Sequence, residues 1–317
     1  MITYVYGELF YSPAKALINP VNTVGIMSSG LSHDFKRFFP DMYEAYRELC
    51  HNDKFSIGQL LLYRSPHKII VNMPTRKSNR ASENLEYIED GLKKFVQIYA
   101  DQGITSASFP AFGMEDGELA WSDVRPIMEA YLAPLPISIY VHLPEDNPPM
   151  PQESRNTRTM RHWLNGLTLD LPFEVFWRDC MAVLKRQDDF VTFFADTQFH
   201  VIMTQARGRQ RLSLKLSPKY GDSIFITESQ LRDIWQYIKR VGYVFPQNMP
   251  SIGSATYEGQ GEELASHIVI SFLANLPYLR AVRLGVQADD SVVGLHYVPP
   301  IEQKPDVRVA ELTSKEA

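Results

Sequence analysis

Short apolar runs alternate with longer amphipathic segments through the first 145 residues of the chain. In the longest amphipathic segment, apolar residues recur every three or four positions from Leu85 to Tyr99, as in a helix with one buried face. Alternating strands and helices predict a layered α/β domain with a largely parallel sheet. The expected strands are 2–5, 16–18, 59–63, 68–72, 106–110 and 137–142, and the expected helices are 30–47, 82–102 and 121–131. Ser82 is the expected N-cap of the second helix, and Gly103 stands where a glycine commonly ends one.

The chain has 317 residues, a length that favours two domains. Residues 145–156 contain three prolines and lack apolar periodicity, which is typical of an extended linker. We predict a first domain over 1–147, a proline-rich linker over 148–160 and a smaller α+β domain over 161–317. The helices expected in the second domain are 172–185, 228–241 and 264–276, and the strands are 190–195, 199–204, 211–216 and 223–226.

The composition, with 44% hydrophobic and 22% charged residues, is that of a globular protein and excludes a disordered, collagenous or coiled-coil chain. The net charge is −5, and the first 150 residues hold 13 Lys and Arg against 18 Asp and Glu, so any nucleic-acid contact needs a local basic patch. Cys50 and Cys180 are far apart, which favours reduced thiols. The chain lacks an apolar run of 18 residues and a signal-peptide pattern, so we expect a soluble, cytoplasmic protein without a membrane partner.

A loop rich in asparagine and glycine follows the expected strand 16–18 and leads into a helix at about Leu31. It carries Asn19, Asn22, Gly25 and Gly30. Glycines let the backbone approach a ligand closely, and the N–H groups at a helix N-terminus attract an anion. The spacing matches neither GxGxxG nor GxxxxGK[ST], so the loop indicates a phosphate site of another kind.

Six short motifs occur in order within the first 145 residues: Tyr6–Phe10, Asn19–Leu31, Phe35–Pro40, Asn72–Thr75, Phe109–Gly113 and Leu119–Trp121. On these motifs, the first half of the chain resembles the macrodomains, which are ADP-ribose-binding modules. Within that family it is similar to the DarG-type branch of DNA ADP-ribosyl glycohydrolase antitoxins. The resemblance implies a three-layer α/β/α fold with a mixed sheet, and ADP-ribose as the ligand without a further cofactor.

The resemblance also implies roles for individual residues. Glu8 stands at the position that accepts a hydrogen bond from the adenine amino group, and Asn22 at the position that hydrogen-bonds the distal ribose. Residues 112–117 match the second phosphate-binding loop. The ligand-binding residues expected in this way are Glu8, Leu9, Asn19, Gly25, Ile26, Met27, Ser28, Ser29, Gly30, Leu31, Thr75, Arg76, Phe112, Gly113, Met114, Glu115 and Gly117.

The sequence departs from the family at the residues expected to carry chemistry. The hydrolytic branch has a lysine directly after Pro-Thr, where this chain has Arg76 followed by Lys77. Arginine stays protonated and cannot act as a nucleophile. The acid of some relatives falls on Gly117, with Asp116 one position earlier. Lys77 and Asp116, with Asn22, are therefore the candidate catalytic residues. Two alternatives stay open: a glycohydrolase that removes ADP-ribose from DNA, RNA or protein, and a reader that binds ADP-ribose without cleaving it.

The second half contains one patterned basic stretch. If residues 207–215 are extended, alternate positions place a row of cations on one face: Arg207, Arg209, Arg211 and Lys215. This row predicts contact with a nucleic-acid backbone, and a charged outer strand that discourages edge pairing is the alternative. The histidine spacing predicts no metal site. The family resemblance implies an ADP-ribosyltransferase toxin as a partner, in a toxin–antitoxin or phage-defence setting.

Overall fold

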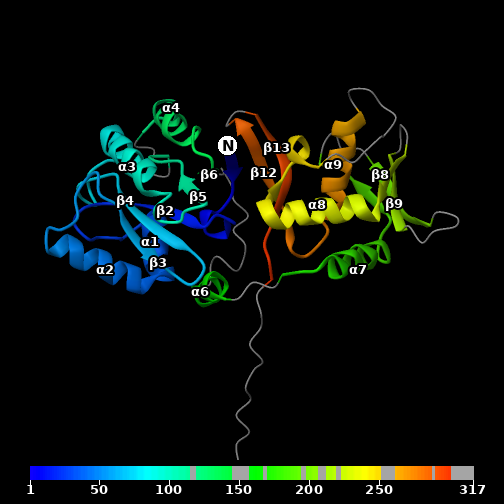
Figure 1. The fold of residues 1–317 in the computed structure, drawn as a ribbon, viewed down its shortest axis with the longest axis horizontal. Coiled ribbons are helices and arrows are strands. Elements are labelled where there is room, and N and C mark those ends of the chain that lie inside the picture. The colour runs from blue at the N-terminus through cyan, green and yellow to red at the C-terminus, as the bar shows by residue number, and fades with distance from the viewer. Residues whose placement is uncertain are drawn as a thin grey trace, which may run out of the picture.

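The computed structural model describes residues 1–114, 119–144, 157–166, 170–193, 198–205, 212–218, 223–250, 261–287 and 290–300. A nine-stranded mixed sheet runs through the N-terminal half and continues into the C-terminal half (Figure 1). The strand order is β11-β13-β12-β1-β6-β5-β2-β4-β3. Its N-terminal strands are β1 (Ile2–Tyr6), β2 (Ala16–Val21), β3 (Leu61–Arg64), β4 (Ile69–Pro74), β5 (Ser106–Pro110) and β6 (Ser138–Leu143). Strands β1, β6, β5, β2 and β4 pair in parallel, and β3 is antiparallel to β4.

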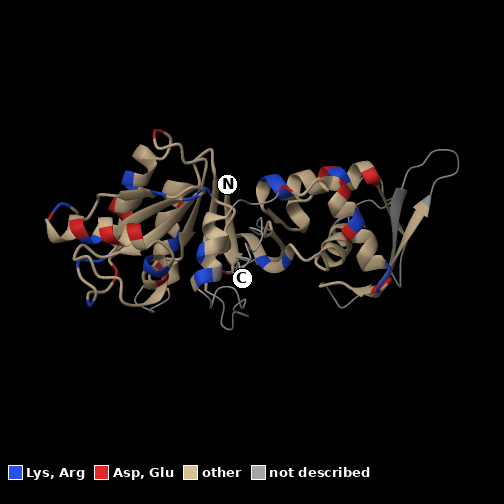
Figure 2. Ribbon diagram, turned by 90° about the horizontal axis from the view of Figure 1, so that it is seen from below, with Lys and Arg blue, Asp and Glu red and all other residues tan. Residues whose placement is uncertain are grey.

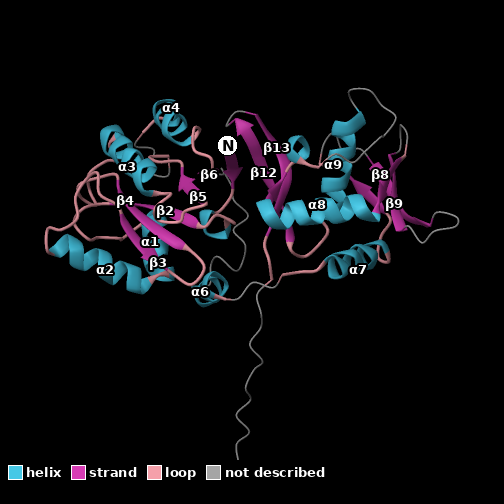
Figure 3. Cartoon of the chain, in the orientation of Figure 1, coloured by secondary structure: helices cyan, strands magenta, loops and turns pink. Residues whose placement is uncertain are grey.

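Helices cover both faces of this sheet, which confirms the predicted α/β/α layers (Figure 3). On one face, α3 (Leu85–Ile98) and α4 (Trp121–Leu132) pack on alternate strand residues such as Ile18 and Val71. On the other face, α1 (Gly30–Phe38) and α2 (Pro40–His51) pack on Leu17 and Ile70. The period of two along each strand sends its side chains to the two cores in turn.

Several helix boundaries differ from the prediction, and two of the differences have a clear local cause. The single helix expected over 30–47 is divided, because Pro40 has no N–H to continue α1 and instead occupies the first turn of α2. Helix α3 begins at Leu85, and its N-cap is Asn84, whose side chain accepts a hydrogen bond from the backbone N of Glu86 at 2.8 Å. Ser82 therefore precedes the helix, and so does Glu83.

The C-terminal half contains a second, four-stranded antiparallel sheet in the order β10-β9-β8-β7. Helices α7, α8 and α9 pack on one face of it around Trp235. Helix α8 has the predicted ends, because Thr227 forms a capping box with Gln230 and Gly242 adopts a left-handed φ of 80°. The elements of this half are α6 (Thr157–Asn165), α7 (Phe173–Leu184), β7 (Asp189–Val191), β8 (Gln198–Gln205), β9 (Leu212–Pro218), β10 (Ile224–Thr227), α8 (Glu228–Val241), β11 (Tyr243–Val244), α9 (Gly261–Leu273), β12 (Leu279–Gln287) and β13 (Asp290–Tyr297), with short 3₁₀ turns at Leu9–Tyr11 and Pro246–Asn248.

Strand β12 joins the two halves, because it pairs antiparallel with β1 at the edge of the parallel strands. The division at residue 147 stays a prediction, and the two predicted domains share this one sheet. Residues 145–156 lie outside the described residues, and α6 begins at Thr157, inside the range predicted to be linker. In the part of the chain that the structure describes, no helix combines the length and apolarity needed to cross a bilayer.

Two histidines are buried on the nine-stranded sheet, His142 on β6 and His296 on β13. The Nδ1 of His142 lies 2.9 Å from the carbonyl oxygen of Gly7, and its Nε2 lies 3.2 Å from the hydroxyl of Ser108. A carbonyl only accepts, so Nδ1 carries the proton and the ring is neutral when Ser108 donates to it. Burial lowers the pKa of His142 to about 4. Burial, with His142 nearby, lowers the pKa of His296 to about 3.

We expect the free energy of unfolding to fall as the pH falls below about 6.5, the ordinary histidine pKa. Between pH 6.5 and 4 the histidines of the unfolded chain bind protons, while the buried rings of the folded chain stay neutral. Each histidine therefore changes the free energy of unfolding by an amount approaching about 1.4 kcal/mol per pH unit. Urea denaturation at several pH values measures the slope. The variant His142→Asn keeps a donor toward Gly7 and should show a shallower slope. Parallel slopes for the two proteins would contradict the assignment.

Candidate functional site

A pocket opens at the carboxyl ends of β2, β4 and β5, with about 650 Å³ of space that includes solvent at its mouth. This edge is where ligands bind in open α/β sheets. The pocket is formed by the end of β2, the loop into α1, the segment between β4 and α3, and the residues after β5. The lining residues are Pro20, Val21, Asn22, Ile26, Ser28, Ser29, Gly30, Leu31, Ser32, Arg76, Asn79, Glu83, Pro110, Ala111, Phe112 and Gly113.

Asn22 shapes the loop on one side of the pocket. Its side-chain amide donates to the carbonyl of Ile26 at 2.6 Å, and its Oδ1 accepts from the backbone N of Val24 at 3.0 Å. The hydroxyl of Tyr46, on α2, lies 2.8 Å from the carbonyl oxygen of Asn22 and 2.9 Å from its Oδ1. Gly25 completes this turn with a positive φ of 79°, against the backbone of Arg47. Asn22, which is predicted to bind the distal ribose, thus also holds the loop in its folded shape.

The N-terminus of α1 forms a second wall. Its N-cap, Ser29, makes no side-chain capping hydrogen bond, and Gly30 adopts a φ of 57° as the helix begins. Ser29, Gly30 and Leu31 all line the pocket. The N–H groups of the first helical turn and the positive end of the helix dipole make this wall suited to an anion such as a phosphate.

Two charged residues form the wall next to β4. Arg76 lines the pocket, and its Nη2 lies 3.5 Å from Oε1 of Glu83. Only 3% of the Glu83 side chain is exposed, and the hydroxyl of Thr75 donates to the same Oε1 at 2.6 Å. Glu83 was not predicted to be a site residue, because a helix start at Ser82 would place it in an exposed first turn. The true N-cap, Asn84, is the signal that would have placed Glu83 before the helix.

Several predicted site residues lie elsewhere. Lys77 is exposed, its Nζ lies 5.7 Å from the centroid of the Tyr87 ring, and it does not line the pocket. Glu8, Gly25, Thr75 and Met114 are not among the residues that line the pocket, and Leu9 and Met27 are buried in the core. Asn19 is fully buried, and its Nδ2 donates to Oδ1 of Asn72 at 2.7 Å, beneath the pocket. Six predicted residues lie outside the described residues. They are Glu115, Asp116 and Gly117 of the second phosphate loop and Arg207, Arg209 and Arg211 of the basic row.

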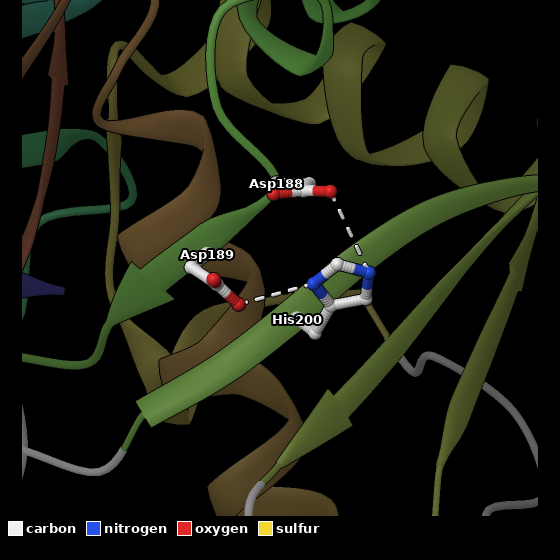
Figure 4. Close-up of side chains that lie close together, drawn as sticks. All are labelled: Asp188, Asp189 and His200. Carbon is white, nitrogen blue, oxygen red and sulfur yellow. Dashed lines mark hydrogen bonds and ion pairs between the residues drawn. The ribbon is translucent and has the colours of Figure 1, made fainter.

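Charges of both signs are interspersed over the two halves of the molecule (Figure 2). Among the described residues, one group of three side chains lies close enough to share a metal ion: Asp188, Asp189 and His200 (Figure 4). Nδ1 of His200 lies 3.0 Å from Asp189, and Nε2 lies 3.8 Å from Asp188. The two ring nitrogens thus face different carboxylates on an exposed surface.

Comparisons with known proteins agree with this geometry. A family model described as Macro domain matches residues 18–128. The DNA ADP-ribosyl glycohydrolase of Thermus aquaticus is 38% identical over 153 residues, which cover 47% of this chain and 42% of that protein. The protein of the same name from Mycobacterium tuberculosis is 35% identical over 140 residues, covering 43% and 40%.

One solved structure, the macrodomain of Thermus aquaticus DarG, is 36% identical to this chain with a TM-score of 0.44. The match covers 45% of this chain and 99% of that structure. A fusion protein of Thermosipho africanus, named DNA ADP-ribosyl transferase-DNA ADP-ribosyl glycohydrolase, is 30% identical over 162 residues, covering 45% of this chain and 42% of the fusion. The chain therefore spans less than half the length of the curated relatives it matches.

We expect Asn22→Ala to lower the free energy of unfolding by about 1–3 kcal/mol, because the Ile26 carbonyl and the backbone N of Val24 lose the side chain that they bond, while the Tyr46 hydroxyl keeps only the backbone carbonyl of residue 22. Chemical denaturation measures the change. Val24→Ala is the matched control, since Val24 is 49% exposed in the same loop and should change stability by less than about 0.5 kcal/mol. Equal effects of the two substitutions would show that Asn22 does not support the loop.

Proposed function

We propose that this chain, whose N-terminal half belongs to the macrodomain family, binds ADP-ribose in the pocket beside α1 and removes it from a nucleic acid. The observation that carries the proposal is the pocket itself. It places the N-terminus of α1, the Asn22 loop and the cation of Arg76 around one cavity at the carboxyl edge of the sheet. A pyrophosphate needs this combination of backbone N–H groups and a guanidinium.

DNA is the carrier that we propose for the ADP-ribose. The relatives reported above are named for that substrate, and ADP-ribosylated RNA and protein remain the alternatives. The fusion protein of Thermosipho africanus is named for both attachment and removal of the group. We infer from it that an ADP-ribosyltransferase is the partner of this chain, acting in the cytoplasm on the DNA that this chain restores.

We expect the protein to bind ADP-ribose with a Kd tighter than about 100 μM, which corresponds to more than about 5.5 kcal/mol. Arg76→Met should weaken binding by about tenfold or more, because a charge-assisted hydrogen bond contributes about 1.5–3 kcal/mol. Isothermal titration calorimetry measures both values. Arg80→Met is the control, since Arg80 is exposed in the same segment and does not line the pocket. Absence of binding at millimolar ADP-ribose would overturn the proposal.

A reader that binds without cleaving is the second candidate. It is favoured by Arg76 at the position of the family's lysine and by the exposed position of Lys77. Incubation with ADP-ribosylated DNA separates the two functions. The glycohydrolase releases free ADP-ribose, and the reader binds the DNA and releases nothing. Lys77→Ala tests the predicted role of Lys77 in the same assay, and Asp116→Ala that of Asp116.

The C-terminal sheet is the proposed contact with the nucleic acid. Its outer face exposes Ile202 (38%) and Phe225 (55%), and the register places Lys215 of β9 opposite both. Three of the predicted basic residues, Arg207, Arg209 and Arg211, come between β8 and β9 in the sequence, outside the described residues. Exposed apolar side chains suit the bases of a single strand, and cations suit its phosphates.

We expect the full chain to bind a single-stranded oligonucleotide more weakly as salt rises, because binding by cations releases counterions. Replacing Arg207, Arg209 and Arg211 by glutamine should reduce both the affinity and the salt slope in fluorescence anisotropy. Replacing Arg178 by glutamine is the control, since Arg178 is an exposed cation on α7, outside the strands of the C-terminal sheet. Salt-independent binding, or an equal affinity of the triple variant, would count against the contact.

A further inference from the structure

We propose that Glu83 is the general base that activates water for the removal of ADP-ribose. The inference rests on the proposed function and names the residue that carries its chemistry. It starts from the one buried carboxylate among the described residues that line the pocket. Neither the family resemblance nor the motif pattern assigns a role to this residue.

The reaction needs a group that accepts a proton at the pocket wall. Hydrolysis of a bond to the anomeric carbon of ribose passes through an oxocarbenium-like state that water attacks, and a carboxylate is the usual base for that water. The guanidinium of Arg76 keeps its proton and cannot serve. The Lys77 ammonium lies over the Tyr87 ring, outside the pocket lining. Glu83 lines the pocket and has the required chemistry.

The structure holds the Glu83 carboxylate in one orientation. Oε1 accepts from the hydroxyl of Thr75 at 2.6 Å and lies 3.5 Å from Nη2 of Arg76. Thr75 is itself fixed, because its backbone N donates to the carbonyl of Val21 at 2.9 Å and its carbonyl accepts from the backbone N of Asn84 at 3.0 Å. The cation and the hydroxyl offset the cost of burying the charge. A base held in this way keeps its position through the reaction.

In this proposal, Arg76 and Glu83 together replace the lysine that the hydrolytic branch has after Pro-Thr. Arg76 supplies the fixed positive charge, which suits a phosphate of the bound ADP-ribose. Glu83 takes a proton from a water molecule as the water oxygen bonds to the anomeric carbon. The bond from that carbon to the nucleic acid breaks, its electron pair stays on the leaving atom, and the proton from Glu83 ends there. Water is the only co-reactant.

The competing explanation is that Glu83 only fixes the segment between β4 and α3. Substitution by glutamine separates the two roles, since glutamine keeps the shape and an oxygen that accepts from Thr75 but cannot take up the proton. We expect Glu83→Gln to lower kcat for release of ADP-ribose from an ADP-ribosylated oligonucleotide by about 10²–10⁴-fold. The Kd for free ADP-ribose should change by less than about threefold. Glu86→Gln, an exposed carboxylate in the first turn of α3, is the matched control and should leave both values unchanged.

A second variant keeps the test decisive if glutamine disturbs the fold. Glu83→Ala opens space at the wall, and added sodium formate, a small carboxylate, should restore part of the release rate. Sodium chloride at equal ionic strength should not. In the wild type, kcat should fall toward acid as the base becomes protonated, and Glu83→Gln should lose this dependence.

The outcomes distinguish this inference from the proposed function. If the wild type releases ADP-ribose and Glu83→Gln does so at a similar rate, Glu83 is not the base and the proposed function stands. If Glu83→Gln loses binding together with release, and formate restores neither in Glu83→Ala, Glu83 has a structural role and the inference is wrong. If the wild type binds ADP-ribose but releases none, hydrolysis itself fails and the inference fails with it.

Discussion

The pairing of β1 on both of its edges is the constraint on which the rest of the structure depends. β1 pairs in parallel with β6 on one side and antiparallel with β12 on the other. A terminal strand of a parallel sheet would otherwise present a row of unpaired N–H and C=O groups. β12 satisfies them, and through β13 and β11 it carries the sheet into the C-terminal half. The buried pair His142 and His296 lies at this junction, where burial excludes protons.

The pocket follows from the order of the parallel strands. β2 lies between β4 and β5, so the residues that follow these three strands gather at one edge. The register of β2 and β4 is fixed just below the pocket, where Asn19 stands opposite Asn72 and their buried amides hydrogen-bond at 2.7 Å. A slip of one of these strands by one residue would send its amide to the other face of the sheet, away from its partner and into an apolar core. The loops that follow these strands can therefore contain glycines and charged residues, because the paired strands fix where each loop begins.

The sequence was informative wherever the structural signal is local. The six N-terminal strands and the ends of α8 follow from apolar runs and capping residues that lie within a few positions of each other. Strands β12 and β13 were not predicted, because Arg280 and Arg283 interrupt the apolar pattern and the burial of β12 depends on β1, at the other end of the chain. In the pocket, the Asn22 loop was predicted from its glycines. Glu83 was missed because a shift of the N-cap from Ser82 to Asn84 turns an expected surface carboxylate into a buried one.

The placement of β12 also affects how the protein is made. The ribosome synthesises Tyr4 near the start of the chain and its partner Gly285 near the end. At about 5–20 residues per second, the edge of β1 waits on the order of 15–60 s for its partner. During that interval the six strands of the N-terminal half can assemble, with one edge open to other chains. Synthesis of β12, rather than completion of the N-terminal half, is the event that closes this edge of the sheet.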